Sequence, residues 1–341
     1  MPSIPVFQVD LDTHPSKRWS KVIHTYKHHI KAIWDDNEKL FQKSVPRVWL
    51  QCLYKYIDHM ARKGYIYHEQ ELRAIAKEAE VPFGGLVMMQ IFYELSACCT
   101  AMVLDHKTLG PVHFRTLDWQ ATQLSNLTIE VHFCRNNKLV YTALTWAGFV
   151  GVFTAMKPGC ASVSLNFRRT NRSFFGNVWR LWMGHWPASY AIRDALERFT
   201  DYNTIVEKLR TTPLVAPCYL MVSGACHQEA IVLARDHDKT VWEKEGKCLI
   251  QTNVDDVKSC RPEHDILFST KRHETALKLA HSILKGVHRA SDINQHLLHR
   301  FLVHPIRNDT TVFACVMNAK HGRSMSTLVT NRDDSVTKCT G

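Results

Sequence analysis

The stretch from residue 98 to residue 118 reads CCTAMVLDHKTLGPVHFRTLD and decides the expected fold. Thr100 to Leu104 has the apolar character of a buried strand, and Val112 to Asp118 reads as a second strand. Between them, His106 to Pro111 carries the glycine and proline that are typical of a turn. The stretch therefore predicts a β-hairpin in an apolar sheet.

Helical and strand-like blocks alternate on both sides of this hairpin. Residues 1–98 read as helical, with apolar side chains at helical spacing and a break at 81–85. In residues 99–341, blocks of strands alternate with blocks of helices. Strands are expected near residues 127–135, 139–147, 150–156, 161–168, 218–223, 230–234, 248–252, 311–317 and 324–330, and helices near 18–34, 46–63, 68–80, 86–95, 174–200, 202–210, 271–285 and 292–301. This order predicts an α+β fold, an αββα sandwich of two antiparallel sheets between helical layers.

Composition limits the class of protein. The chain has 341 residues, 45% of them hydrophobic, which is enough for one large core or two tightly joined parts. It contains no apolar run of the roughly 18 residues that a membrane-spanning helix needs. The net charge is +11, but the lysines and arginines are spread along the chain. This favours a basic enzyme without a nucleic-acid partner, and weak docking onto anionic lipid is the alternative.

Cysteine and histidine are frequent, but neither indicates a metal site. The 11 cysteines are scattered without a C-x-x-C spacing, and the 20 histidines show no set of three ligands at metal-binding spacing. No metal, no cofactor and no disulfide framework is expected, and a reducing compartment fits best. The first residues lack the features of a signal peptide. As written, the chain is expected in the cytoplasm, or in the lysosome or outside the cell if a leader has been removed.

The hairpin brings a thiol close to two charged side chains. Cys99 begins the first strand and can face Arg115 and Asp118 near the end of the second. A guanidinium lowers the pKa of a neighbouring thiol, and a carboxylate orients a nearby amine, so the three residues suit a reactive centre. The spacing by itself favours a simpler interpretation, a buried cysteine beside an Arg–Asp ion pair.

The spacing of the three residues and the sequence of other segments are a second line of evidence for a reactive centre. Arg115 follows Cys99 by 16 residues, and Asp118 follows it by 19. Further segments that match one family are residues 7–12 with 17–19, 91–95, 135–138, 147–151, 157–159 and 251–255. Together they resemble the acid ceramidase and N-acylethanolamine-hydrolysing acid amidase family, part of the choloylglycine-hydrolase-like group. The resemblance covers nearly the whole chain and implies the N-terminal-nucleophile hydrolase fold.

The resemblance implies that the chain cuts itself. Scission of the Cys98–Cys99 peptide gives an α fragment, residues 1–98, and a β fragment, residues 99–341, which stay associated. The family's Cys-Thr pair favours Cys99 over Cys98 as the nucleophile. Cys99 then carries a free α-amine, which serves as the general base for its own thiol. The thiol attacks the amide of a fatty-acyl lipid and forms a thioester, and water releases the free fatty acid.

The resemblance also implies roles for five residues. Cys99 is the nucleophile, Arg115 orients the nucleophile region, and Asp118 binds the α-amine. Asn253 lies in the segment that matches the family's Thr-Asn-Tyr-Asp and is expected to donate to the tetrahedral oxyanion. A further catalytic arginine of the family is carried to Arg272, the nearest match.

Departures from the family pattern leave substrate and activity open. Phe114 replaces a glycine and is expected to place a bulky side chain beside the site, and Phe167 replaces a glutamate. These changes motivate the alternative of a catalytically impaired, lipid-binding relative. The short segment between Asp118 and Leu127 favours N-acylethanolamines over ceramide as substrates. A bile-acid or penicillin amidase-like specificity is a third option.

Aromatic side chains cluster between Phe174 and Trp186. Their spacing favours the buried face of an amphipathic helix. The alternative is an exposed patch that gathers acyl chains or contacts a membrane surface.

Overall fold

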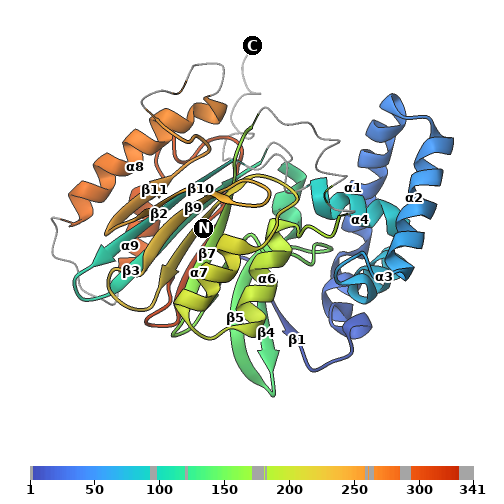
Figure 1. Ribbon diagram of the computed structural model, residues 1–341, viewed down its shortest axis with the longest axis horizontal. Coiled ribbons are helices and arrows are strands. Elements are labelled where there is room, and N and C mark those ends of the chain that lie inside the picture. The colour runs from blue at the N-terminus through green and yellow to red at the C-terminus, as the bar shows by residue number, and fades with distance from the viewer. Residues whose placement is uncertain are drawn as a thin grey trace, which may run out of the picture.

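The computed structural model describes residues 3–92, 98–119, 122–170, 180, 183–257, 260, 265–284 and 293–329. Two sheets lie face to face, and helices cover the outer side of each (Figure 1). A lobe of N-terminal helices stands beside this sandwich (Figure 1). The predicted αββα sandwich is confirmed.

The two sheets differ in size within the described residues. In spatial order, the larger sheet consists of β1 (Val6–Asp10), β4 (Thr128–Arg135), β5 (Lys138–Trp146), β6 (Thr154–Lys157), β7 (Ala161–Phe167), β8 (Cys218–Gly224), β9 (Ala230–Arg235) and β10 (Thr240–Glu245). The smaller sheet consists of β11 (Cys248–Gln251), β2 (Cys98–His106), β3 (Gly110–Asp118), β12 (Thr311–Asn318) and β13 (Arg323–Leu328). The predicted hairpin is therefore the centre of the smaller sheet, as β2 and β3.

Helices form the outer layers and the lobe. Those on the larger sheet are α6 (Ala188–Arg198) and α7 (Tyr202–Thr211), and those on the smaller sheet are α8 (Ser269–Leu284) and α9 (Ile293–Phe301). The lobe contains α1 (Ser20–Ser44), α2 (Arg47–Arg62), α3 (Glu69–Glu78) and α4 (Phe83–Phe92). Most predicted helices and strands lie within a few residues of these bounds.

Strands β2 and β3 are buried on both faces, which explains their nearly continuous apolar sequence. Side chains alternate along a strand, so neighbouring residues enter different parts of the core. Ala101 and Val103 cluster with Met221 of the larger sheet. Met102 and Phe114 instead cluster with apolar residues of α8 and α9. This alternation decides which residues of the hairpin meet at the site.

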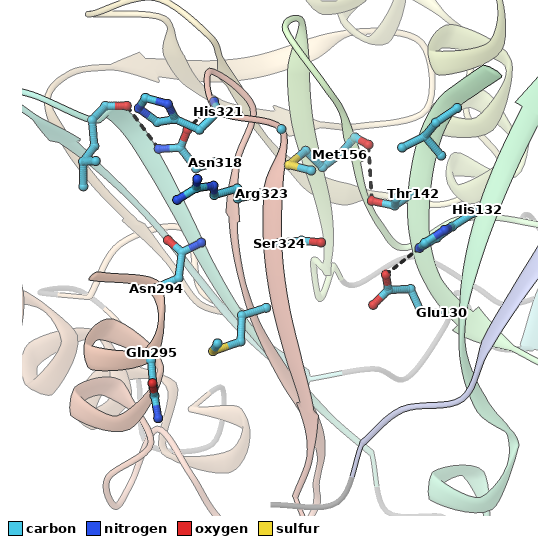
Figure 2. Close-up of a pocket in the computed structure, with 14 residues that line it drawn as sticks. Glu130, His132, Thr142, Met156, Asn294, Gln295, Asn318, His321, Arg323 and Ser324 are labelled. Atoms are coloured by element: carbon cyan, nitrogen blue, oxygen red, sulfur yellow. Dashed lines mark hydrogen bonds and ion pairs between the residues drawn. The ribbon is translucent and has the colours of Figure 1, made fainter. Parts of the chain in front are cut away.

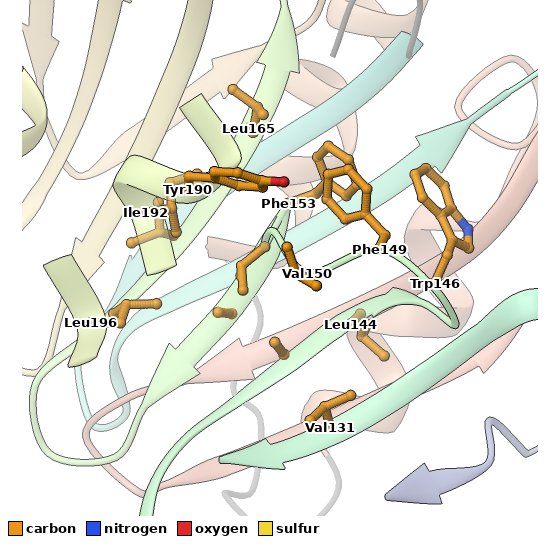
Figure 3. Close-up of a cluster of buried hydrophobic side chains, with 14 of the residues drawn as sticks. Val131, Leu144, Trp146, Phe149, Val150, Phe153, Leu165, Tyr190, Ile192 and Leu196 are labelled. Carbon is orange, nitrogen blue, oxygen red and sulfur yellow. The ribbon is translucent and has the colours of Figure 1, made fainter. Parts of the chain in front are cut away.

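An aromatic group packs beside β2, the strand that carries Cys99. Phe149 and Phe153 stack with ring centroids 4.5 Å apart, and Phe153 also packs on Trp146 at 4.9 Å. Figure 3 shows these rings beside Leu165, and Cys99 belongs to the same buried cluster. Dense packing of this kind holds the adjacent backbone in one position, including the carbonyls of Phe153 and Leu165.

The N-terminal region departs from the prediction because it is not wholly helical. Val6–Asp10 forms β1, which pairs in parallel with β4, so the larger sheet is not purely antiparallel. Phe7 and Val9 point inward at a period of two, while Val6 and Gln8 are exposed. The signal for a strand was present but short. As a result, the segment before Cys99 contributes an edge strand to the larger sheet.

Further elements differ from the prediction. In the expected helix at 174–200, residues 183–187 are not helical, and α6 begins only at Ala188. Helix α4 begins at Phe83, inside the expected break at 81–85, because Gly84 and Gly85 lie in the helix where it packs closely on its neighbours. An added Cβ at Gly85 would overlap the Trp34 ring, so these glycines serve close packing rather than a turn. Strand β10 was not predicted, because its residues are mostly exposed and charged at the sheet edge.

Candidate active site

The register of the hairpin divides the predicted cluster between two faces of the smaller sheet. Cys98 pairs with Asp118, and Cys99 pairs with Leu117. Residues directly opposite in an antiparallel pair share a face, so Asp118 lies on the face of Cys98, toward α8 and α9. Cys99 and Arg115 lie on the other face, toward the larger sheet.

The Cys99 thiol is held between Arg115 and the larger sheet. Arg115 Nη2 donates to Cys99 Sγ at 3.0 Å, and Sγ donates to the carbonyl of Leu165 at 3.7 Å. Arg115 Nη1 donates to the carbonyl of Phe153 at 2.5 Å. Cys99 and Arg115 are both fully buried, at 0% exposure. The guanidinium therefore contacts the thiol, and the simpler interpretation of an Arg115–Asp118 ion pair does not describe this site.

Burial dominates the pKa of this thiol. Burial raises the pKa of Cys99, whereas the charge and the hydrogen bond of Arg115 lower it, and the net direction is upward. The predicted effect of the guanidinium is thus present, but desolvation is larger. The resting thiol is protonated, and its attack on a carbonyl requires that the proton be removed first.

Asn253 binds the nitrogen of Cys99. Asn253 Oδ1 accepts from the Cys99 backbone N–H at 3.0 Å and from Arg272 Nη2 at 2.9 Å. Asn253 Nδ2 donates to the carbonyl of Phe167 at 2.8 Å. In the uncut chain this side chain faces the leaving nitrogen with its oxygen. Its expected role as an oxyanion donor stays a prediction, and it requires Nδ2 to exchange its present partner.

Arg272 joins the two faces of the sheet at the start of β2. Arg272 Nη1 donates to the carbonyl of Cys99 at 2.7 Å and to Thr100 Oγ1 at 2.9 Å, and it lies 3.5 Å from Asp118 Oδ2. Arg272 Nη2 also donates to Ser269 Oγ at 2.9 Å. Both ions of the Arg272–Asp118 pair are fully buried. Arg272, to which the family resemblance assigned a catalytic arginine, therefore contacts the predicted nucleophile through its backbone carbonyl.

Asp118 is a buried carboxyl group with one satisfied oxygen. Its Oδ1 accepts from Thr311 Oγ1 at 2.7 Å, and its Oδ2 makes no hydrogen bond among the described residues. Burial raises the pKa of Asp118, against the lowering effects of Arg272 and Thr311. Burial thus disfavours the charged form of this carboxyl group, and the charge of Arg272 opposes that effect.

All five predicted site residues lie in one network around the Cys98–Cys99 peptide. Side-chain and backbone groups that the sequence did not predict complete it, namely the hydroxyls of Thr100, Ser269 and Thr311 and the carbonyls of Leu165 and Phe167. No sequence pattern marks a backbone carbonyl, but Thr100 stands directly beside the nucleophile in the quoted motif. The arrangement gives the predicted nucleophile a partner for its thiol, its nitrogen and its carbonyl.

Phe114 does not lie beside the thiol, contrary to the prediction. Its ring packs on Phe301 of α9 with centroids 5.0 Å apart. Phe114 precedes Arg115 on the strand, so it points to the opposite face. The Phe114 side chain therefore fills the core beside α9 and does not line the surroundings of Cys99.

A cavity of about 650 Å³ lies at the other end of the hairpin from Cys99 (Figure 2). Residues of both sheets and α9 line it, including Glu130, Arg323 and Leu109 in the hairpin turn. The length of β2 separates this turn from Cys99, roughly 23 Å at about 3.3 Å per residue. The cavity is therefore distinct from the site of the thiol.

The predicted aromatic cluster is only partly described. Met183 is exposed, and Trp186 stacks on Tyr67 of the N-terminal lobe with centroids 4.0 Å apart. Outside the described residues lie Phe174, Phe175, Trp179 and Trp182. Within the part of the chain that is described, no helix is long and apolar enough to cross a bilayer, and no three His, Cys, Asp or Glu side chains group as metal ligands.

Comparisons with known proteins agree with this geometry. A family model described as the beta subunit of N-acylethanolamine-hydrolyzing acid amidase matches residues 2–65. An N-acylethanolamine-hydrolyzing acid amidase of Caenorhabditis elegans is 29% identical over 335 residues, 91% of this chain and 88% of that protein. Acid ceramidase of Bos taurus is 30% identical over 282 residues, 74% of this chain and 70% of that protein.

A solved structure shows the same fold. The Caenorhabditis elegans N-acylethanolamine-hydrolyzing acid amidase ortholog aligns with a TM-score of 0.58 at 28% identity, covering 68% of this chain and 100% of that chain. The family model matches only residues that precede Cys99. Its description calls that piece beta, whereas the expected fragment of residues 1–98, within which the match lies, is labelled α. The resemblance inferred from the sequence is confirmed.

Proposed function

This chain belongs to the acid ceramidase and N-acylethanolamine-hydrolysing acid amidase family, and on that premise we propose that it is a self-processing cysteine amidohydrolase that releases fatty acid from a lipid amide. The network around Cys99 carries the proposal. Its thiol contacts Arg115, its N–H contacts Asn253 and its carbonyl contacts Arg272. The thiol and the nitrogen that react thus each have a polar partner, and Arg272 holds the Cys99 carbonyl on the other side of the residue.

In self-cleavage the Cys99 thiol attacks the carbonyl carbon of Cys98. A C–S bond forms, the C–N bond breaks, and the thiol proton passes to the departing nitrogen. Arg115 stabilises the thiolate against the cost of burial, which otherwise raises the pKa of the thiol. Water then hydrolyses the thioester and leaves a carboxylate on Cys98 and a free amine on Cys99.

The new amine forms where the Cys99 N–H stood, within reach of Asn253 Oδ1. Asp118 pairs with Cys98 in the register and keeps an oxygen without a hydrogen bond among the described residues. That oxygen is suited to accept from the ammonium, which supports the role of Asp118 in binding the α-amine. As a neutral base, the amine removes the thiol proton and later returns it to the leaving amine of the lipid.

Among lipid amides, we assign N-acylethanolamines as the preferred class and ceramide as the second. The short connection after Asp118 supports this order. We also assign a membrane-surface contact to the region from Phe174 to Trp186, which the exposure of Met183 supports. Both assignments are finer than the amidase activity itself and are tested separately from it.

The experiment compares wild type with Cys99→Ala and Cys98→Ala after acidic incubation. Denaturing gels and mass spectrometry of the new termini should show cleavage between Cys98 and Cys99 in wild type, none in Cys99→Ala, and cleavage retained in Cys98→Ala. Cleaved protein should then release fatty acid from an N-acylethanolamine, a ceramide or both. If wild type is cleaved but hydrolyses neither lipid, the proposed substrate class is wrong and the proposed self-cleavage still holds.

A second candidate function is lipid binding without catalysis. The observation that favours it is the complete burial of Cys99 in the uncut chain, together with a thiol pKa that is raised. Phe167 in place of the family's glutamate points the same way. Wild type that stays uncut across acidic and neutral pH, yet binds a fluorescent acyl amide, would establish this alternative.

A further inference from the structure

A bidentate ion pair stands next to the predicted oxyanion residue. Arg168 Nε and Nη2 donate to the two carboxylate oxygens of Asp255 at 2.8 and 2.7 Å. Tyr219 Oη and Trp242 Nε1 add donors to Asp255 Oδ1 at 3.0 and 3.1 Å. The carboxylate is 44% exposed, but its four donors fix both its position and its orientation.

This pair links the same two segments that Asn253 links. Arg168 directly follows Phe167, whose carbonyl accepts from Asn253 Nδ2 at 2.8 Å. Asp255 follows Asn253 by two residues. The hydrogen bond and the ion pair therefore close one ring between the end of β7 and the segment after β11.

The segment after β11 depends on side chains for its position. β11 ends at Gln251, and Asn253 lies beyond it in irregular backbone. Asn166 Nδ2 donates to the carbonyl of Gln251 at 2.9 Å, which adds a third link at the near end. Among the described residues, Asn253 has no partner in a neighbouring strand, because the pairing of β11 with β2 ends at Gln251. The ion pair at Asp255 therefore anchors the segment beyond the sheet.

We propose that the Arg168–Asp255 pair is a positioning device for Asn253, which keeps Asn253 Oδ1 on the Cys99 nitrogen and thereby sets the rates of self-cleavage and amide hydrolysis. The proposal rests on the proposed function. Among the described residues neither side chain hydrogen-bonds to Cys99 itself, so both act through Asn253 rather than as catalytic groups.

The charge state of the pair supports this assignment under acidic conditions. Burial raises the pKa of Asp255, but the hydrogen bonds and charge of Arg168 outweigh it, so the net pKa lies below the ordinary value. The carboxylate therefore stays ionised in mildly acidic solution, and the pair persists there.

The test is a double-mutant cycle on the rates. We expect Asp255→Asn to slow self-cleavage and to lower kcat of the cleaved enzyme by about tenfold or more, with KM changed less than twofold. Arg168→Lys should retain more kcat than Arg168→Gln because it keeps the charge. In an Asn253→Ala background Asp255→Asn should have almost no further effect, because residues that act through one another are not additive. Additive losses would overturn the proposal.

A matched control is Asp58→Asn in α2, which removes a carboxylate held by Arg73 at 2.7 Å in the remote lobe and should leave both rates unchanged. Hydrogen exchange gives a readout that needs no activity. In uncut protein, Asp255→Asn should speed exchange in peptides covering 251–257 and 98–106, and Asp58→Asn should not. If Asp255→Asn leaves exchange in these peptides unchanged, the positioning role of the ion pair is rejected, even if wild type shows no activity. A wild type that neither cuts itself nor hydrolyses lipid rejects the proposed function instead.

Discussion

Asn253 accepts the backbone N–H of Cys99 through Oδ1 at 3.0 Å, across 154 residues of sequence. In the proposed mechanism the same nitrogen is the leaving group of self-cleavage and then the catalytic amine. One amide oxygen would therefore serve this nitrogen in both steps. Arg272 Nη2 donates to that oxygen at 2.9 Å, which fixes the orientation of the amide with its oxygen toward Cys99.

Removal of this amide should impair both reactions. We expect Asn253→Ala to lower kcat by about 10²–10³, the range found when one donor to a developing oxyanion is lost. Self-cleavage should slow as well, because the Cys99 nitrogen loses its acceptor. Timed intact-mass measurements and fatty-acid release measure the two rates. Asn37→Ala, at a half-buried position of α1 in the N-terminal lobe, is the control, and equal rates in all three proteins would contradict the assignment.

The charge of Arg115 should set the pH dependence of self-cleavage. Arg115 lowers the pKa of the Cys99 thiol against the raising effect of burial, so Arg115→Gln should raise that pKa further. The cleavage rate should then fall and its pH profile should move to higher pH. Arg115→Lys keeps a cation and should shift the profile less. Rates followed from pH 4 to pH 9 measure this, and an unshifted profile in Arg115→Gln argues against a thiolate paired with Arg115.

The sequence predicted the hairpin because its evidence is local. Apolar runs on either side of a glycine–proline turn specify two strands, and the structure has them as β2 and β3. The sequence also allows a prediction of which hairpin side chains share a face of the sheet. Adjacent residues on a strand point to opposite sides, so Phe114 and Arg115 cannot both face the thiol. Counting along the strand corrects that prediction without coordinates.

The other half of the site was not available from local patterns. Asn253 and Arg272 lie 154 and 173 residues from Cys99, and only the family resemblance assigned them to the site. Asp255 lies in a segment noted for its resemblance and Arg168 directly follows the departure at Phe167, but nothing in either segment predicts their pairing. Long-range contacts of this kind depend on how the two sheets pack, which no period in the sequence encodes.

The N-terminal piece should stay bound after cleavage through a buried ion pair. Arg193 Nη1 and Nη2 donate to Glu71 at 2.7 and 2.8 Å, and Trp19 Nε1 donates to the same carboxylate at 2.6 Å. Burial raises the pKa of Glu71, but Arg193 outweighs it and brings the pKa to about 2. A lowered carboxyl pKa stabilises the fold above the ordinary value of 4.5, and this contribution is lost only as the pH falls toward 2.

We therefore expect Glu71→Gln to leave buried Arg193 with Glu197, 2.7 Å away, as its counter-charge, at a cost of at most about 3–5 kcal/mol. In cleaved protein the two pieces should separate at lower urea concentration than in wild type, at pH 5 as well as at pH 7. Glu69→Gln on the same helix, whose partner Arg73 is more exposed, is the control. Size-exclusion chromatography in urea measures the separation. If the pieces of Glu71→Gln and of wild type separate at the same urea concentration, the Glu71–Arg193 pair is not the main contact that holds them together.

A buried histidine should make the fold sensitive to acid. His113 Nδ1 and Nε2 lie 3.0 and 2.9 Å from the hydroxyls of Ser162 and Ser164, and burial, with the charge of Arg115, lowers its pKa to about 3 from 6.5. Between these values the unfolded chain binds a proton that the folded chain does not, so stability falls as the pH drops below 6.5. Each unit costs at most about 1.4 kcal/mol.

In a Cys99→Ala background, which prevents cleavage, we expect the difference in unfolding free energy between pH 7.5 and pH 4.5 to shrink by roughly 2–3 kcal/mol in His113→Gln. The comparison uses this difference rather than absolute stability, because glutamine cannot reproduce both serine contacts. His28→Gln, on the exposed face of α1, should leave the difference unchanged. An equal pH dependence in all three proteins would mean that His113 is protonated in the fold at acidic pH, and that Arg115 does not oppose that charge.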